Sequence, residues 1–310
     1  MADWYFRNNN QNNNTAHNGL KVCPGCRNLV KPSEEFCPYC ARRLRAAGGV
    51  RGWWRKTLSR PFVATRFLLG MIVAVFVLQF VADFFLPAQY RIPMRGGGIF
   101  GLLTANPLTY IRMGSNFHPF VAEFGQYWRF LTYCFLHFGL IHILFNGWAL
   151  WDLGRLAERL WGPRQVFATF VLTGIAGGFF SFAWNMALSN WSNSAGASGS
   201  LCGILGLLLG AYFKKKHQIG EYLGSQLIRW AVMILVFGLV AGADNAAHIG
   251  GMMSGAVLGY FLSPTDHSRT LERDMQIWNY AAIVSLALLV VCAAFAVVFF
   301  AHGPAYARSL

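Results

Sequence analysis

Residues 196–210 read GASGSLCGILGLLLG, and residues 246–262 read AAHIGGMMSGAVLGYFL. Both stretches are almost entirely apolar, and their polar groups lie near their first residues. Small residues recur along each stretch at the spacing of one helix face, namely Gly199, Gly203 and Gly206 in the first and Gly251, Gly255 and Gly259 in the second. Such faces let two helix backbones approach closely in lipid. We therefore expect two membrane helices that pack tightly against each other.

The composition of the whole chain agrees with a membrane protein. Of its 310 residues, 55% are hydrophobic and 12% are charged, whereas soluble domains carry about 25% charged residues. This excludes a disordered, collagen-like or disulfide-stapled chain. About 20 residues of helix cross a bilayer core. The predicted spans are Phe67–Leu86, Leu140–Leu156, Val166–Leu188, Ser198–Phe213, Leu227–Ala243, Ala246–Leu262 and Tyr280–Ala301.

The basic residues predict the orientation of these helices. Lys and Arg outnumber Asp and Glu by 26 to 12. Near the predicted helix ends, seventeen Lys or Arg residues fall on one side and five on the other, and residues 42–66 alone hold eight. The richer side is expected to be cytoplasmic, which places the N-terminus inside and the C-terminus outside. Topology then accounts for the positive charge, and we expect no nucleic-acid partner.

The N-terminus, MADWYFRNNNQ, has no apolar core of a cleavable signal peptide. The first membrane helix is therefore expected to act as its own insertion signal. We predict a multi-pass protein of a bacterial cytoplasmic membrane.

Polar groups gather where three predicted helices begin. The second helix region reads HFGLIHILFN over residues 137–146, the fourth opens with GASG at 196–199, and the sixth opens with DNAAHIGG at 244–251. Buried groups of this kind are functional candidates because burying them is costly. Helices two, four and six all run from outside to inside, so His142, Ser198 and His248 lie at similar depth. A Ser and a His can meet there, as nucleophilic catalysis requires.

Between about Arg66 and Leu262 the chain resembles the rhomboid family of intramembrane serine proteases. The resemblance rests on five features in order: Trp128-Arg129, HxxxxHxxxN at 137–146, Glu158-Arg159, GASG at 196–199, and AHxxGxxxG at 247–255. It implies an all-α polytopic helix bundle with a six-helix rhomboid core. The seventh helix and a small N-terminal zinc module lie outside that core.

The resemblance also implies roles for individual residues. Ser198 would be the nucleophile and His248 the general base, a dyad without an acidic third member. His142, Asn146 and the Ser198 amide would stabilise the oxyanion. Structural support would come from Gly196, Gly199, Gly251, Gly255, Trp128, Arg129 and His137. Catalysis would need no cofactor, and the expected partners are transmembrane protein substrates, cleaved near the outer face, and the lipid bilayer.

Several alternatives stay open. In the family an aromatic residue four positions after the nucleophile usually stacks on the catalytic His, but here that residue is Cys202. Asp244 could help to orient His248, or could only satisfy amides at a helix start. A catalytically inert rhomboid-like escort protein would lack the Ser or the His. A transporter would need broken helices or charges at mid-depth.

The remaining motif is a C-x2-C-x10-C-x2-C pattern at Cys23, Cys26, Cys37 and Cys40. Four thiolates in two knuckles fit a tetrahedral structural zinc ion, and a cytoplasmic partner is its expected function. The predicted organisation is a disordered Asn-rich tail at 1–20, a zinc-ribbon-like module at 21–42, a basic linker at 43–66, a rhomboid core at 67–265, and a linker with a seventh helix at 266–310.

Overall fold

The computed structural model describes residues 15–16, 20–23, 28–31, 34, 37–39, 62–84, 104–214, 221–262 and 268–302. The chain divides into two compact units, Met1–Arg60 and Pro61–Leu310. The five predicted segments are finer than this division, and their boundaries stay a prediction.

The first unit holds a small antiparallel sheet in the order β1-β2-β3, formed by Thr15–Ala16, Leu20–Val22 and Leu29–Val30. Thr15 pairs with Lys21, and Lys21 pairs with Val30. Thr15, Ala16 and Leu20 of these strands lie within the predicted Asn-rich tail, residues 1–20. The other residues of that tail lie outside the described residues.

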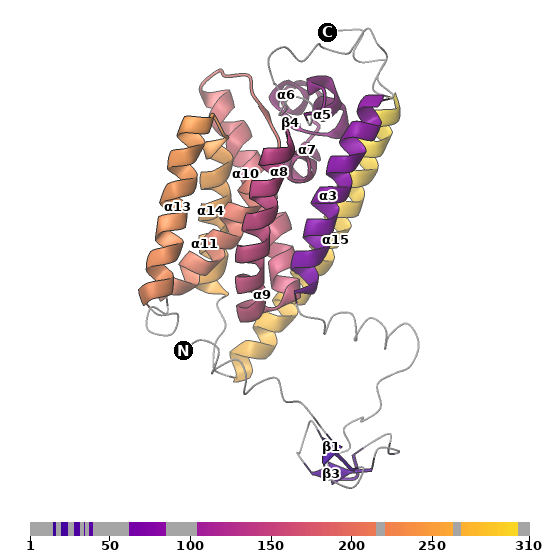
Figure 1. Ribbon diagram of the computed structural model, residues 1–310, viewed down its shortest axis with the longest axis vertical. Coiled ribbons are helices and arrows are strands. Elements are labelled where there is room, and N and C mark those ends of the chain that lie inside the picture. Colours follow the sequence, from indigo (N-terminus) through magenta and orange to yellow (C-terminus); the bar gives the residue numbers. More distant parts are fainter. Residues whose placement is uncertain are drawn as a thin grey trace. The chain divides into compact units, whose positions relative to one another are not determined.

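The second unit is a bundle of helices (Figure 1). Its main helices are α3 (Val63–Phe84), α8 (Leu140–Ala149), α9 (Arg155–Trp161), α10 (Pro163–Ala187), α11 (Ser198–Lys214), α13 (Glu221–Ala241), α14 (Asn245–Phe261) and α15 (Ser268–His302). A π-helical turn, η3 (Leu150–Gly154), joins α8 to α9. All seven predicted apolar stretches are helical over most of their length, which confirms the predicted helix-bundle fold.

Four of the described helices are long and apolar enough to cross a membrane: α3, α10, α13 and α15. A fifth span results if Arg129–Phe135 and Leu140–Trp161, which meet at an angle of 96°, are taken together. Helices α11 and α14 have only 17 residues each. These helices make the chain an integral membrane protein, while the orientation of its termini stays a prediction.

Short elements on the long first loop lie at the end of the bundle where α11 begins. They are α5 (Pro107–Met113), β4 (Asn116–Phe117), α6 (His118–Phe124), α7 (Arg129–Thr132) and the 3-10 turn η2 (Tyr133–Phe135). Strand β4 pairs antiparallel with β5 (Asn193–Ser194), which immediately precedes α11. This pairing ties the first loop to the segment that leads into residues 196–199.

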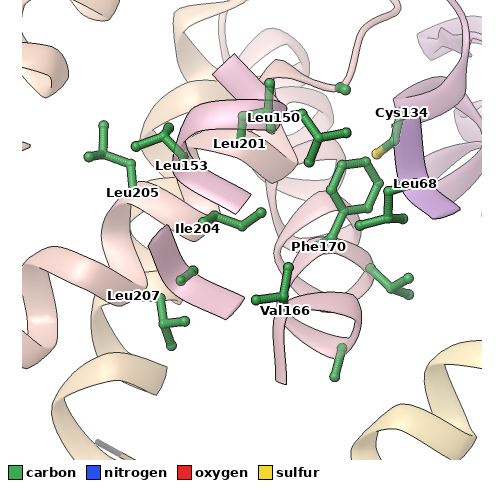
Figure 2. Close-up of a cluster of buried hydrophobic side chains, with 14 of the residues drawn as sticks. Leu68, Cys134, Leu150, Leu153, Val166, Phe170, Leu201, Ile204, Leu205 and Leu207 are labelled. Carbon is green, nitrogen blue, oxygen red and sulfur yellow. The ribbon is translucent and has the colours of Figure 1, made fainter. Parts of the chain in front are cut away.

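Helix α11 is the centre of the bundle. Every residue from Gly199 to Tyr212 is buried, and α11 contacts α10, α13 and α14. A helix that is apolar on all sides is expected inside a bundle rather than against solvent. Figure 2 shows Leu201, Ile204, Leu205 and Leu207 of this helix in one cluster with Phe170 of α10 and Leu68 of α3. Because its neighbours enclose it, α11 crosses the core despite its short length.

The glycines of α11 and α14 meet along the whole contact between these helices. A side chain at Gly251 would collide with the Gly199 carbonyl oxygen, and one at Gly255 with the Gly203 carbonyl oxygen. The same holds for Gly259 against the carbonyl oxygen of Leu207. The two backbones are therefore in direct contact, as the small-residue spacing predicts.

The seventh helix, α15, packs against the core at both ends. Near its start, Asn279 accepts a hydrogen bond of 2.6 Å from the Arg164 guanidinium, and Trp278 is buried. Near its end, the Phe300 carbonyl accepts a bond of 2.9 Å from Arg112, and the Phe299 ring lies 5.8 Å from that of Trp128. Helix α15 therefore braces α10 and the first loop.

Glu158 of α9 holds the start of α3. Its carboxylate accepts hydrogen bonds from the Ala64 amide at 3.1 Å, the Thr65 amide at 2.9 Å and the Thr65 hydroxyl at 2.7 Å. The first amides of a helix lack acceptors within the helix, and a negative charge near them interacts favourably with the helix dipole. Glu158 thus serves as a cap from a distant part of the chain.

Replacing a glycine in the α11–α14 contact is expected to destabilise the bundle. Gly255→Val should lower the free energy of unfolding by at least about 1–3 kcal/mol, because added atoms in a well-packed core force backbone shifts. The measurement is a denaturant titration in detergent micelles. The control is Gly70→Ala, because a methyl group at Gly70 meets nothing within 4 Å. Equal stability of the two variants would contradict close backbone contact.

Removing the Glu158 cap is expected to cost about 1–3 kcal/mol, because buried amides lose their acceptor. The same titration applied to Glu158→Ala measures this loss. Glu123→Ala, at an exposed position of α6, should leave the stability unchanged. A Glu158→Ala protein as stable as the Glu123→Ala protein would refute the capping role.

Candidate active site

Ser198 and His248 are in hydrogen-bond contact. The Ser198 hydroxyl lies 2.9 Å from Nε2 of His248. Ser198 is the first residue of α11, and His248 lies in the first turn of α14. His248 is only 4% exposed. The α11–α14 contact therefore brings together a hydroxyl and an imidazole that are fifty positions apart in sequence.

The loop before Ser198 passes closely beside His142. Gly196 has a φ of 137°, a backbone conformation that favours glycine. A side chain there would also come within 2.8 Å of Cε1 and Nε2 of His142. The Phe138 amide donates to Nδ1 of His142 at 3.4 Å, and the Phe138 ring stacks on that imidazole. With Nδ1 as an acceptor, the neutral ring carries its proton on Nε2, on the side of the loop before Ser198.

Two further predicted oxyanion donors are available at this end of the bundle. Asn146 is buried, and its amide donates at 2.9 Å to the His142 carbonyl one turn earlier. A primary amide has two hydrogens, so this bond uses only one of them. The Ser198 N–H stands at the first position of α11, where helix amides lack an intrahelical acceptor.

His137 lies at the break between η2 and α8. Its backbone N–H donates at 3.0 Å to the side chain of Gln79 of α3, and its carbonyl accepts from the same side chain at 2.9 Å. Its Nε2 lies 3.5 Å from the Ala197 amide. Gln79 therefore provides hydrogen-bond partners for the His137 N–H and carbonyl, which lie at the break between the two helices. The sequence analysis missed Gln79, although a lone polar residue in an apolar helix was the available signal.

Trp128 and Arg129 hold the first loop. The Arg129 guanidinium is fully buried and donates at 2.8 Å to the carbonyls of both Ile111 and Ser115. It also lies 4.6 Å from the centre of the Trp128 ring and 5.0 Å from that of Phe299. These contacts join α5, α7 and α15.

Asp244 connects the start of α14 to the segment before Ser198. Its carboxylate accepts hydrogen bonds from the hydroxyls of Ser181 and Ser194 and, at 3.0 Å, from the Ala247 amide. Ser194 belongs to β5, so one carboxylate joins α10, the segment before Ser198 and α14. The bond to the Ala247 amide caps the start of α14.

A cavity of about 260 Å³ lies apart from this site, between α6 and the end of α10. Its lining includes His118, Glu123, Asn185 and Trp191. Burial lowers the pKa of His118, and the Ser192 hydroxyl lies 3.3 Å from its Nδ1. The residues that line this cavity include none of the predicted site residues.

The predicted zinc ligands are described only in part. Cys23 and Cys37 are buried together with Val30 in one small cluster. Cys26 and Cys40 lie outside the described residues. Within the described ranges no group of three or more His, Cys, Asp or Glu side chains could hold a metal ion. The zinc site therefore stays a prediction.

Comparison with known proteins gives one family. A family model described as the Rhomboid domain matches residues 124–265. The chain is 30% identical over 224 residues to the rhomboid protease AarA of Providencia stuartii, which covers 64% of this chain and 76% of that protein.

Two other relatives carry related names. The rhomboid protease GluP of Bacillus subtilis is 33% identical over 153 residues, which are 49% of this chain and 29% of that protein. The rhomboid protease GlpG of Yersinia pestis is 28% identical over 157 residues, which are 49% of this chain and 53% of that protein. The chain thus spans less than two thirds of the length of these two relatives.

Proposed function

Because this chain belongs to the rhomboid family, we propose that it is an intramembrane serine endopeptidase that cleaves transmembrane proteins near the outer face of the membrane. The observation that carries the proposal is the distance of 2.9 Å between the Ser198 hydroxyl and Nε2 of His248. Both groups lie at helix starts, Ser198 in α11 and His248 in α14.

The proposed reaction begins with attack of Ser198 on the scissile carbonyl. His248 accepts the hydroxyl proton and then donates it to the leaving amine. An acyl-enzyme ester remains, and water hydrolyses it with His248 again acting as the base. Water must therefore reach the helix starts from the outer side. The substrate helix must unwind locally, because its carbonyls are otherwise held in backbone hydrogen bonds.

The oxyanion formed in each step needs donors that are already in place. We assign this role to His142, Asn146 and the Ser198 amide. The His142 ring supports the assignment, because its Nδ1 accepts from Phe138 and its Nε2 side borders Gly196. The dipole of α11 adds partial positive charge at Ser198.

Replacing the nucleophile is expected to abolish both cleavage and covalent labelling. Ser198→Ala should lose cleavage of a model transmembrane substrate and labelling by a fluorophosphonate probe, with a rate at least about 1,000-fold lower. His248→Ala should do the same because the general base is gone. The measurement is a cleavage assay with purified protein in detergent or liposomes.

The matched control is Ser254→Ala. The Ser254 hydroxyl lies on α14 but donates only to the Gly250 and Gly251 carbonyls of its own helix, so activity and labelling should persist. Cleavage by the Ser198→Ala protein would reject the proposed function.

We also propose that the N-terminal module holds one structural zinc ion through Cys23, Cys26, Cys37 and Cys40, in line with the shared burial of Cys23 and Cys37. Closed sites with four thiolates are structural and leave no position for catalysis. The purified full chain should contain one zinc per molecule. Cys37→Ser should lower the zinc content with probe labelling of Ser198 retained, whereas Cys292→Ser should leave the zinc content unchanged. Metal-free wild-type protein, or full zinc content in Cys37→Ser, would reject the site.

A further inference from the structure

The His248 ring has a second side-chain partner. Its Nδ1 lies 3.1 Å from Oδ1 of Asn245, while its Nε2 faces Ser198. We propose that Asn245 is a positioning residue that sets the tautomer and the orientation of His248, and that it makes both depend on helix α13. This inference rests on the proposed function and adds a third residue to the Ser–His pair.

The orientation of the Asn245 amide follows from its other contact. Its Nδ2 donates at 3.0 Å to the carbonyl of Leu235 on α13. Since the NH2 group is directed to that carbonyl, the oxygen of the amide is the atom that faces His248. A carbonyl oxygen can only accept, so Nδ1 of His248 carries the ring proton. Nε2 then presents a lone pair to the Ser198 hydroxyl, which is the form a general base needs.

The contact with α13 fixes the Asn245 side chain in place. Gly238 lies directly against the amide, and a side chain at Gly238 would collide with Oδ1 of Asn245. The Ala243 amide also donates to the Gly238 carbonyl at 2.8 Å, which closes the turn between α13 and α14. One face of α13, formed by Leu235 and Gly238, therefore determines where the Asn245 oxygen lies.

Helix α13 lies at the outside of the bundle, whereas every residue of α11 from Gly199 to Tyr212 is buried. Only 17% of the apolar segment of α13 is buried, against 56% for α10. Val236, Phe237, Leu239 and Val240 are all more than half exposed. Because most of α13 faces outward, a shift of this helix would move the Leu235 carbonyl without displacing the buried helix α11. Asn245 transmits such a shift to His248.

Cys202 makes this support more important. The family resemblance leads us to expect an aromatic ring over His248 at that position, but a buried Cys stands there. Among the described residues, the hydrogen-bonded side-chain partners of the His248 ring are Ser198 and Asn245. The bond to Asn245 therefore takes over the orienting task that a stacked ring would perform.

The test compares kcat, KM and the pH dependence of kcat/KM for transmembrane-substrate cleavage by purified full-length variants. Asn245→Ala should lower kcat up to about 100-fold, because a misplaced base loses near-attack geometry. KM should stay close to the wild-type value, because Asn245 faces His248 and α13. Gly238→Ala is a change on α13 that should push the Asn245 side chain out of place. It should also lower kcat with KM unchanged.

Asn245→Asp separates positioning from a purely structural role. The carboxylate keeps an acceptor for Nδ1–H and should restore kcat above the acidic limb of the profile. It also favours the protonated imidazole, so the acidic limb of kcat/KM should move to higher pH. The other titratable groups that interact with His248, namely Asp244 and His142, are the same in every variant. If Asn245→Ala does not fold, Asn245→Asp and Gly238→Ala decide the question.

The matched control is Asn185→Ala. Asn185 is another Asn whose side-chain amide donates to a backbone carbonyl, that of Ser181, but it belongs to α10. Its replacement should lower stability and leave kcat and the pH profile unchanged. Wild-type kcat in both Asn245→Ala and Gly238→Ala, or an unmoved acidic limb in Asn245→Asp, would overturn the proposal. An inactive wild-type protein that no fluorophosphonate labels would instead reject the proposed function.

Discussion

The direct backbone contact between α11 and α14 is the interaction on which the rest of the second unit depends. In lipid, apolar side chains gain nothing by leaving one hydrocarbon environment for another, so close packing has to hold the helices together. Here the α-carbons of Gly251, Gly255 and Gly259 lie against carbonyl oxygens of α11. Glycine at these positions permits the approach, and the approach places Ser198 within hydrogen-bond distance of His248.

The second constraint is that backbone groups inside a membrane must be satisfied by the protein itself. The helices of this chain are interrupted where α8 and α11 begin, and buried polar side chains compensate for the interruptions. Gln79 bonds both backbone groups of His137, and Asp244 joins Ser181, Ser194 and Ala247. The amide of Ser198, at the first position of α11, is the helix-start amide that the proposed chemistry uses.

The helices of the second unit differ in how much of their surface is buried. Helices α10, α11 and α14 share a tightly packed interior, whereas α13 presents most of its surface outward. Asn245 bonds both to α13 and to His248, so it connects an outer helix with the packed interior of the bundle. The extra helix α15 contacts a different part of the core. Its Phe299 ring and Phe300 carbonyl contact Trp128 and Arg112 of the first loop.

The sequence by itself determined the helices, the close-packed pair and the identity of the candidate Ser and His, because hydropathy and glycine spacing are local properties. It gave no sign of strand β1, because Thr15 and Ala16 form a strand only by pairing with Lys21 and Leu20. The sequence also did not decide whether Asp244 or other packing orients His248. Only the tertiary structure decided that Asp244 bonds to Ser181 and Ser194 while its neighbour Asn245 faces the ring. The partner of each side chain depends on which groups of other helices lie within hydrogen-bond distance, such as the Leu235 carbonyl for Asn245. A local sequence pattern does not contain that distance.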